Sequence, residues 1–110
     1  MTIKMNEQII KELFKTLTKR KKNSEEISYT SFLVKNPELV AKKIGEESAE
    51  LIIDCIKKNK NGVIRESADL IYHMLVVWIT MDIKPEEIWN ELSSRKSKSG
   101  FEEKKDRGKK

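Results

Sequence analysis

The sequence predicts an all-α protein, and three observations lead to this fold class. Apolar residues recur at helical spacing near the start of the chain, at Ile9, Ile10, Leu13, Phe14 and Leu17. Proline and acidic residues open two helices, at Asn36-Pro37-Glu38 and at Lys84-Pro85-Glu86-Glu87. The 110 residues include only 4 Gly and 2 Pro, which is too few turn formers for a many-stranded sandwich or barrel.

The same patterns place the elements in order. We expect helices over about residues 5–20, 37–60, 63–81 and 84–95, with Asn61-Gly62 as the stop between the second and the third. The segment that ends at Lys35 has no clear period, so we interpret it as a loop, rich in Ser and Thr, that can dock Tyr29, Phe32 and Leu33. The expected architecture is an antiparallel helical bundle with two long central helices.

The third expected helix is apolar on nearly every side from Leu70 to Ile79, with His73 as the polar exception. A helix of this kind is buried all round, and one small chain is hard pressed to cover it. We therefore predict a homodimer or a larger homo-oligomer. Cys55 falls on the apolar face of the second helix and is expected in the core.

Composition and charge exclude several classes of protein. Residues 95–110 contain eight basic and three acidic residues, so the net charge of +5 comes from a charged tail at about 96–110. We treat residues 1–110 as a single domain. Outside the tail this domain is neutral, so its charge does not favour nucleic-acid binding. A non-enzymatic helical module that binds nucleic acid stays an alternative. One cysteine excludes a multi-cysteine zinc site. No segment suits a membrane span or a signal peptide, and a cytoplasmic location is expected.

Acidic residues form a stripe on each of the two long helices. The first stripe consists of Glu46, Glu47, Glu50 and Asp54, and the second of Glu66 and Asp69, with His73 one turn further on. One interpretation is a solvated surface with Lys43 and Lys57 as salt-bridge partners. The other is that Glu47, Glu50, Glu66 and Asp69 converge where the two helices pack together.

Four converging carboxylates need a counter-charge, because their mutual repulsion would otherwise force some of them to take up protons. A set of ligands made of oxygen atoms, without a histidine pair or several cysteines, favours Mg²⁺ or Mn²⁺ over zinc. Mg²⁺ commonly binds through a few carboxylates together with substrate phosphates. The two stripes therefore predict a nucleotide phosphate as the class of substrate.

These residues also resemble a known family. Glu46-Glu47-Ser48-Ala49-Glu50 followed by Glu66-Ser67-Ala68-Asp69 is similar to the metal motif of the all-α, MazG-like nucleoside triphosphate pyrophosphohydrolases. Four further segments resemble the phosphoribosyl-ATP pyrophosphatases of histidine biosynthesis: Ser28-Tyr29-Thr30, Lys42-Lys43-Ile44-Gly45-Glu46-Glu47, Ala68-Asp69-Leu70-Ile71-Tyr72-His73 and Ser99-Gly100-Phe101-Glu102-Glu103-Lys104. The resemblance covers about residues 27–107, and no counterpart is placed for residues 1–26.

The resemblance implies a Mg²⁺-dependent hydrolase, homodimeric or larger, that converts phosphoribosyl-ATP to phosphoribosyl-AMP and pyrophosphate. Its metal ligands would be Glu47, Glu50, Glu66 and Asp69, with Glu46 in a secondary place. Glu47 or Glu50 would orient or deprotonate the water that attacks the α-phosphorus. The basic residues that would meet substrate phosphates are Lys42, Lys43, Lys104 and Arg107. A general nucleoside triphosphate pyrophosphohydrolase of the same superfamily is the alternative, and His73 is expected to be a hydrogen-bonded structural residue.

Overall fold

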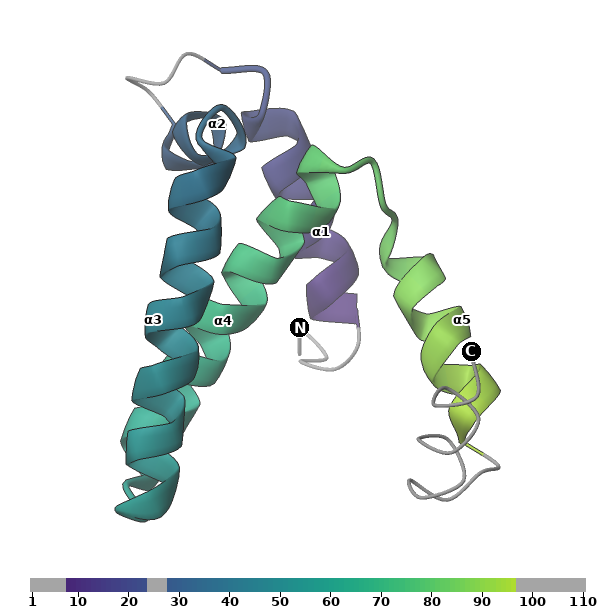
Figure 1. The fold of residues 1–110 in the computed structure, drawn as a ribbon. Coiled ribbons are helices and arrows are strands. Elements are labelled where there is room, and N and C mark those ends of the chain that lie inside the picture. The colour runs from purple at the N-terminus through teal and green to yellow at the C-terminus, as the bar shows by residue number, and fades with distance from the viewer. Residues whose placement is uncertain (1–7, 24–27, 97–110) are drawn as a thin grey trace, which may run out of the picture.

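A computed structural model describes residues 8–23 and 28–96 of the chain, and this part is folded into five helices (Figure 1). They are α1 (Gln8–Arg20), α2 (Tyr29–Val34), α3 (Pro37–Ile56), α4 (Lys60–Thr80) and α5 (Pro85–Arg95). The all-α class is confirmed, and the helix starts expected at Pro37 and Pro85 are correct. None of these helices combines the length and the apolar character that a membrane crossing requires.

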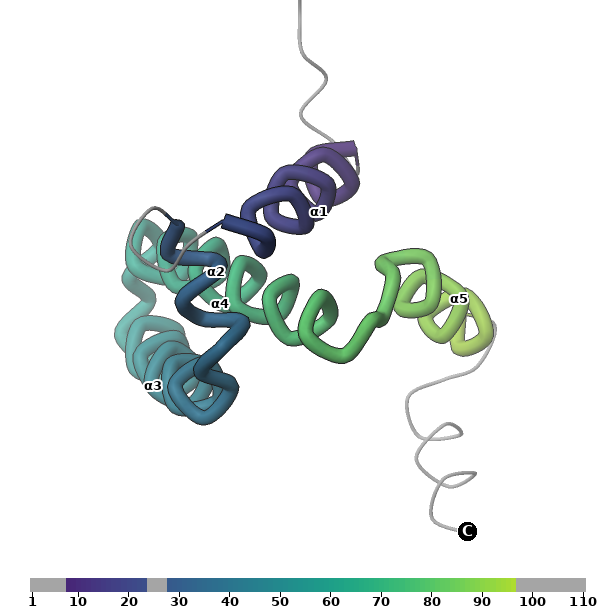
Figure 2. Tube along the Cα trace, turned by 90° about the horizontal axis from the view of Figure 1, so that it is seen from above, coloured from purple at the N-terminus to yellow at the C-terminus, as the bar shows by residue number. Residues whose placement is uncertain are grey.

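Two apolar clusters hold the helices together. In the first, Leu17 of α1 packs against Leu75 and Ile79 of α4. In the second, Leu33 of α2 and Val40 of α3 pack against Val76 of α4. Both clusters use the C-terminal half of α4, so this helix is the common support for the other three. Figure 2 shows α1 and α3 on opposite sides of α4.

The segment interpreted as a loop contains the short helix α2, so the loop assignment at residues 29–34 was wrong. The Ser28 hydroxyl caps this helix by accepting a hydrogen bond of 3.2 Å from the Ser31 amide. Leu33 docks in the core as expected and is fully buried, whereas Tyr29 stays half-exposed. The Ser and Thr residues that suggested a loop therefore act as a cap and as hydrogen-bonding groups of a helix.

The turn between the long helices lies earlier than expected. α3 ends at Ile56 and α4 begins at Lys60, so Asn61 and Gly62 belong to the first turn of α4. The reversal occurs at Lys58, whose φ of 58° lies in the left-handed region. The Asn59 side chain then caps α4 by accepting a 3.1 Å hydrogen bond from the Gly62 amide. Gly62 lets the Asp54 carboxylate approach the start of α4 closely, and a Cβ atom there would force that side chain to shift.

Helix α5 begins at Pro85, and the carboxylate of Glu87 in its first turn accepts a hydrogen bond of 2.9 Å from the Lys84 amide. Figure 1 shows α5 and α3 at opposite sides of the molecule. Trp89 of α5 meets Trp78 of α4 edge to face, with ring centroids 6.3 Å apart.

Burial within one chain corrects one expectation, for Cys55, and agrees with another, that a single chain does not cover the apolar run of α4. Cys55 is exposed, because it lies about three helical turns beyond Ile44 and so beyond the part of α3 that packs against an apolar cluster. In the run from Leu70 to Ile79, the side chains of Leu75, Val76 and Ile79 are buried, but Ile71 and Met74 are exposed. The single chain therefore covers one side of α4 and leaves the other open.

The cap of α4 can be tested by mutation. Asn59→Ala removes the hydrogen bond to the Gly62 amide and should lower the free energy of unfolding by about 1 kcal/mol. Asn61→Ala is the matched control, since Asn61 is exposed inside the first turn. Urea unfolding curves should show a loss for Asn59→Ala alone; equal midpoints for both variants would contradict the cap.

Candidate active site

The two acidic stripes lie on α3 and α4, the two helices that meet at the Lys58 turn. On α3, Glu46 and Glu50 are exposed, whereas Glu47 is buried with 9% of its surface accessible. On α4, Glu66 is partly buried and Asp69 is exposed. The predicted ligands therefore differ strongly in their access to water.

Glu50 and Glu66 interact directly across the two helices. Partial burial raises the pKa of the Glu66 carboxyl above its usual range, and a side-chain hydrogen bond with Glu50 and the negative charges of Glu50, Asp69 and Asp54 raise it further. The structure thus places Glu50 and Asp69 near enough to affect the charge of Glu66, and it adds Asp54, which the sequence placed on the stripe but not in the ligand set.

Glu47 has a different partner. Nδ1 of His73 lies 2.8 Å from Oε1 of Glu47 and 3.0 Å from the backbone oxygen of Asp69. His73 is itself buried, with 6% of its surface exposed. The expectation of a hydrogen-bonded histidine is confirmed, but its pairing with Glu47 was missed, because the only sequence signal was that His73 follows Asp69 by one helical turn.

The chemistry of these residues fits a hard divalent cation. The donors are carboxylate oxygens, and the pKa of Glu66 is raised by burial first and then by the negative charges of Glu50, Asp69 and Asp54, which a cation would offset. In residues 8–23 and 28–96, no three His, Cys, Asp or Glu side chains are already grouped closely enough to hold an ion. Binding would require the carboxylates of the predicted ligands to come closer together than they are in this structure.

The predicted phosphate-binding residues fall into two groups. Lys42 is exposed, and Lys43 is partly buried with its Nζ 4.0 Å from Oε1 of Glu46. This ion pair supports a surface salt bridge as the alternative to phosphate binding by Lys43. Lys104 and Arg107 lie outside the described residues.

A sequence model of the family "Phosphoribosyl-ATP pyrophosphohydrolase" matches residues 10–96. The chain belongs to the phosphoribosyl-ATP pyrophosphohydrolase family. The match begins within α1, so it corrects the expectation that residues before 27 have no counterpart. It also covers both acidic stripes and His73.

Curated relatives of the phosphoribosyl-ATP pyrophosphohydrolase family match over nearly their whole length. A protein named phosphoribosyl-ATP pyrophosphatase from Paramagnetospirillum magneticum is 36% identical over 104 residues, which is 94% of this chain and 95% of the relative. A protein of the same name from Clostridium novyi is 41% identical over 96 residues, covering 86% of this chain and 87% of the relative. A third, from Paracoccus denitrificans, is also 41% identical, over 86% of this chain and 89% of its own.

The raised pKa of Glu66 makes the stability of the metal-free protein depend on pH. A carboxyl whose pKa is higher in the folded state binds protons more tightly there, so its stabilising contribution is complete at low pH and is lost as pH rises through the raised pKa. Glu66→Gln removes this loss. Its thermal midpoint should exceed that of the wild type at neutral pH, and the difference should shrink below about pH 4.

Glu46→Gln is the control for this measurement, because Glu46 pairs with Lys43 instead of with another carboxylate. It should give no gain at neutral pH. A Glu66→Gln midpoint equal to that of the wild type at every pH would show that the carboxylates of the two helices do not repel one another.

Proposed function

We propose that this protein hydrolyses phosphoribosyl-ATP to phosphoribosyl-AMP and pyrophosphate, as a step of histidine biosynthesis. The observation that carries the proposal is the family match over residues 10–96, together with relatives named phosphoribosyl-ATP pyrophosphatase that align over nearly their full length. Both acidic stripes lie inside the matched region, so the residues suited to phosphate chemistry come with the family membership. Because the substrate is derived from ATP, we place the reaction in the cytoplasm.

The proposed metal ligands are Glu47, Glu50, Glu66 and Asp69, with Glu46 as a secondary candidate and Asp54 near enough to contribute charge. The bound ion would be Mg²⁺, or Mn²⁺, and would supply positive charge next to the phosphate oxygens. The support is the raised pKa of the Glu66 carboxyl, which comes from its partial burial and then from the negative charges of Glu50, Asp69 and Asp54.

Glu47 and Glu50 remain the candidates for orienting or deprotonating water. Glu50 is exposed, whereas Glu47 is mostly buried and has one oxygen bound to His73. Water therefore reaches Glu50 more readily, and we assign Glu50 as the base and Glu47 as a ligand. The activated water attacks the α-phosphorus in line, and pyrophosphate leaves with the bond electrons. Lys42 and Lys43, and in the tail Lys104 and Arg107, would neutralise substrate phosphates as point charges.

The metal proposal predicts a large effect of one isosteric substitution. Asp69→Asn keeps the shape and removes a negative charge, so it should lower activity by more than about 10-fold, since a neutral amide is a poor ligand for a hard cation. The variant should fold as well as the wild type, because repulsion around Glu66 falls. Pyrophosphate release and thermal unfolding measure the two effects.

Asp82→Asn provides the matched control. Asp82 is exposed beyond the other end of α4, and its φ of 57° is one that Asn also tolerates. Its activity should equal that of the wild type. Full activity of Asp69→Asn at ordinary Mg²⁺ concentration would end the metal assignment and favour a solvated acidic surface.

Substrate choice separates the main proposal from its alternative. Rates of pyrophosphate release should be higher with phosphoribosyl-ATP than with any member of a panel of free nucleoside triphosphates, and they should require Mg²⁺. Faster turnover of the free triphosphates would instead identify a general pyrophosphohydrolase. Tight, salt-dependent binding of duplex nucleic acid without pyrophosphate release would favour the non-enzymatic alternative.

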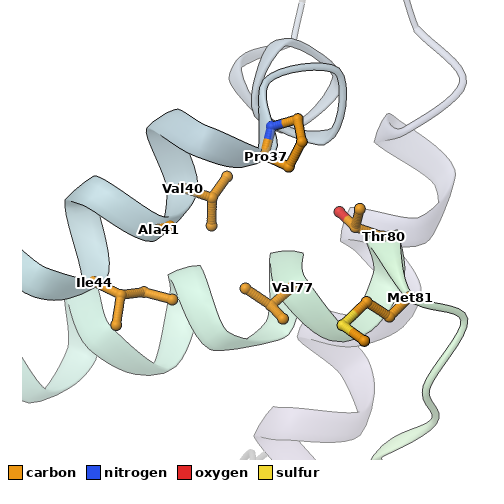
Figure 3. Close-up of a pocket in the computed structure, with 7 residues that line it drawn as sticks. All are labelled: Pro37, Val40, Ala41, Ile44, Val77, Thr80 and Met81. Atoms are coloured by element: carbon orange, nitrogen blue, oxygen red, sulfur yellow. The ribbon is translucent and has the colours of Figure 1, made fainter.

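We further propose that the working unit is a homodimer. Six large apolar side chains are exposed on the two long helices: Ile52, Ile53 and Ile56 on α3, and Ile64, Ile71 and Met74 on α4. Figure 3 shows a second apolar surface, a groove between the diverging ends of these helices that Val40, Ile44, Val77 and Met81 face. Exposed apolar surface on this scale supports a second copy as the covering partner.

A charge on the exposed face of α3 should separate the two copies. Ile53 is 50% exposed in the single chain, so Ile53→Lys costs the monomer little, but it places an unpaired charge in a dimer interface that includes α3. Ile9→Lys on α1 is the control, since Ile9 has nearly the same exposure of 49%. Light scattering should give the mass of two chains for Ile9→Lys and of one for Ile53→Lys. A fully active wild-type species with the mass of one chain would refute the dimer.

A further inference from the structure

We propose that His73 is a positioning residue that holds the Glu47 carboxylate in place for metal binding; this inference rests on the metal site proposed above. The two side chains come from different helices and are 26 residues apart in the sequence. Both are buried, His73 with 6% and Glu47 with 9% of the surface exposed. Their contact is therefore a fixed feature of the packed interior.

The protonation of the ring follows from its neighbours. Nδ1 lies 3.0 Å from the backbone oxygen of Asp69, which can only accept a hydrogen bond, and 2.8 Å from Oε1 of Glu47. An unprotonated Nδ1 would face the carbonyl oxygen with two lone pairs opposed. Nδ1 therefore carries the hydrogen and donates to both oxygens.

This arrangement couples the two acidic stripes. Through one N–H group, the ring connects the carboxylate of Glu47 on α3 with the backbone of Asp69, a proposed ligand on α4. A free glutamate has three rotatable bonds, and ordering it costs conformational entropy. Because the hydrogen bond to His73 orders Glu47 when the protein folds, this entropy is not lost again when a cation binds. The remaining 12% exposure of the Glu47 side chain is where a cation can reach it.

The other ring nitrogen argues against a purely space-filling role. Among the side-chain nitrogen and oxygen atoms of the described residues, only Nε2 of His73 is fully buried without a hydrogen-bond partner. The rings of Tyr29 and Tyr72 lie edge-on to the imidazole, at interplanar angles of 84°. A buried polar atom without a partner costs about 1–3 kcal/mol. The benefit of a histidine here therefore comes from Nδ1 and from the carboxylate that it orients.

Three substitutions at one position separate orientation from packing. Asn carries its amide nitrogen directly on Cγ, as His carries Nδ1, so His73→Asn keeps a donor near Glu47. Gln carries its nitrogen one bond further out, and His73→Leu has no donor. Tyr72→Phe is the matched control: it removes the neighbouring hydroxyl, which lies 2.9 Å from Oγ1 of Thr30, and leaves the His73–Glu47 bond intact.

The measurement is the Kd of Mn²⁺ for each full-length variant, obtained by calorimetry and electron paramagnetic resonance, with circular dichroism to confirm folding. His73→Leu and His73→Gln should weaken Mn²⁺ binding by about 10–100-fold, the usual effect of losing a residue that orients a ligand. His73→Asn should stay within a few-fold of the wild type, and Tyr72→Phe should not change it.

Two outcomes would overturn the inference separately from the proposed function. If Asp69→Asn weakens Mn²⁺ binding but folded His73→Leu does not, the metal site stands and the role of His73 falls. If His73→Leu fails to fold, the test is the comparison of His73→Asn with His73→Gln. Equal Mn²⁺ affinities of these two variants would then overturn the inference. If the wild type itself binds no Mn²⁺, both the metal site and the role of His73 are refuted.

Discussion

The gathering of carboxylates on α3 and α4 is the constraint on which the candidate site of this protein depends. The two helices meet at the Lys58 turn and diverge toward their other ends (Figure 1). Their acidic stripes lie in the parts nearer the turn. The fold responds to that charge in two ways. At Glu66, partial burial and then the neighbouring Glu50, Asp69 and Asp54 raise the pKa of the carboxyl. Glu47 instead accepts a hydrogen bond from a buried histidine.

The supporting packing lies at the other end of α4. Leu75, Val76 and Ile79 are buried against α1, α2 and α3, so the second half of this helix is held firmly. His73 stands directly before this buried segment, and Glu66 lies two turns earlier, where α4 is more open to water. The packed C-terminal half of α4 therefore supports the more accessible N-terminal half, which carries the acidic residues of the candidate site.

Local sequence signals predicted the helices well where the deciding interactions are local. Proline at the first position and acids in the first turn identified α3 and α5. The short helix α2 was missed, because six residues are too few to show a period and its Ser and Thr residues are equally common in loops. Gly62 was interpreted as a helix stop, although its actual role, close approach to Asp54, depends on the neighbouring helix.

The sequence by itself determined the all-α class, the positions of the long helices, the candidate carboxylates and the family, because each of these depends on residues within a few turns or on a motif. Only the tertiary structure decided which acids pair, that Asp54 adds to the charge around Glu66, and that His73 binds Glu47. The faces of α3 and α4 left exposed also follow from tertiary packing. These features depend on how two helices cross, and the crossing is set by many weak apolar contacts between residues distant in the sequence.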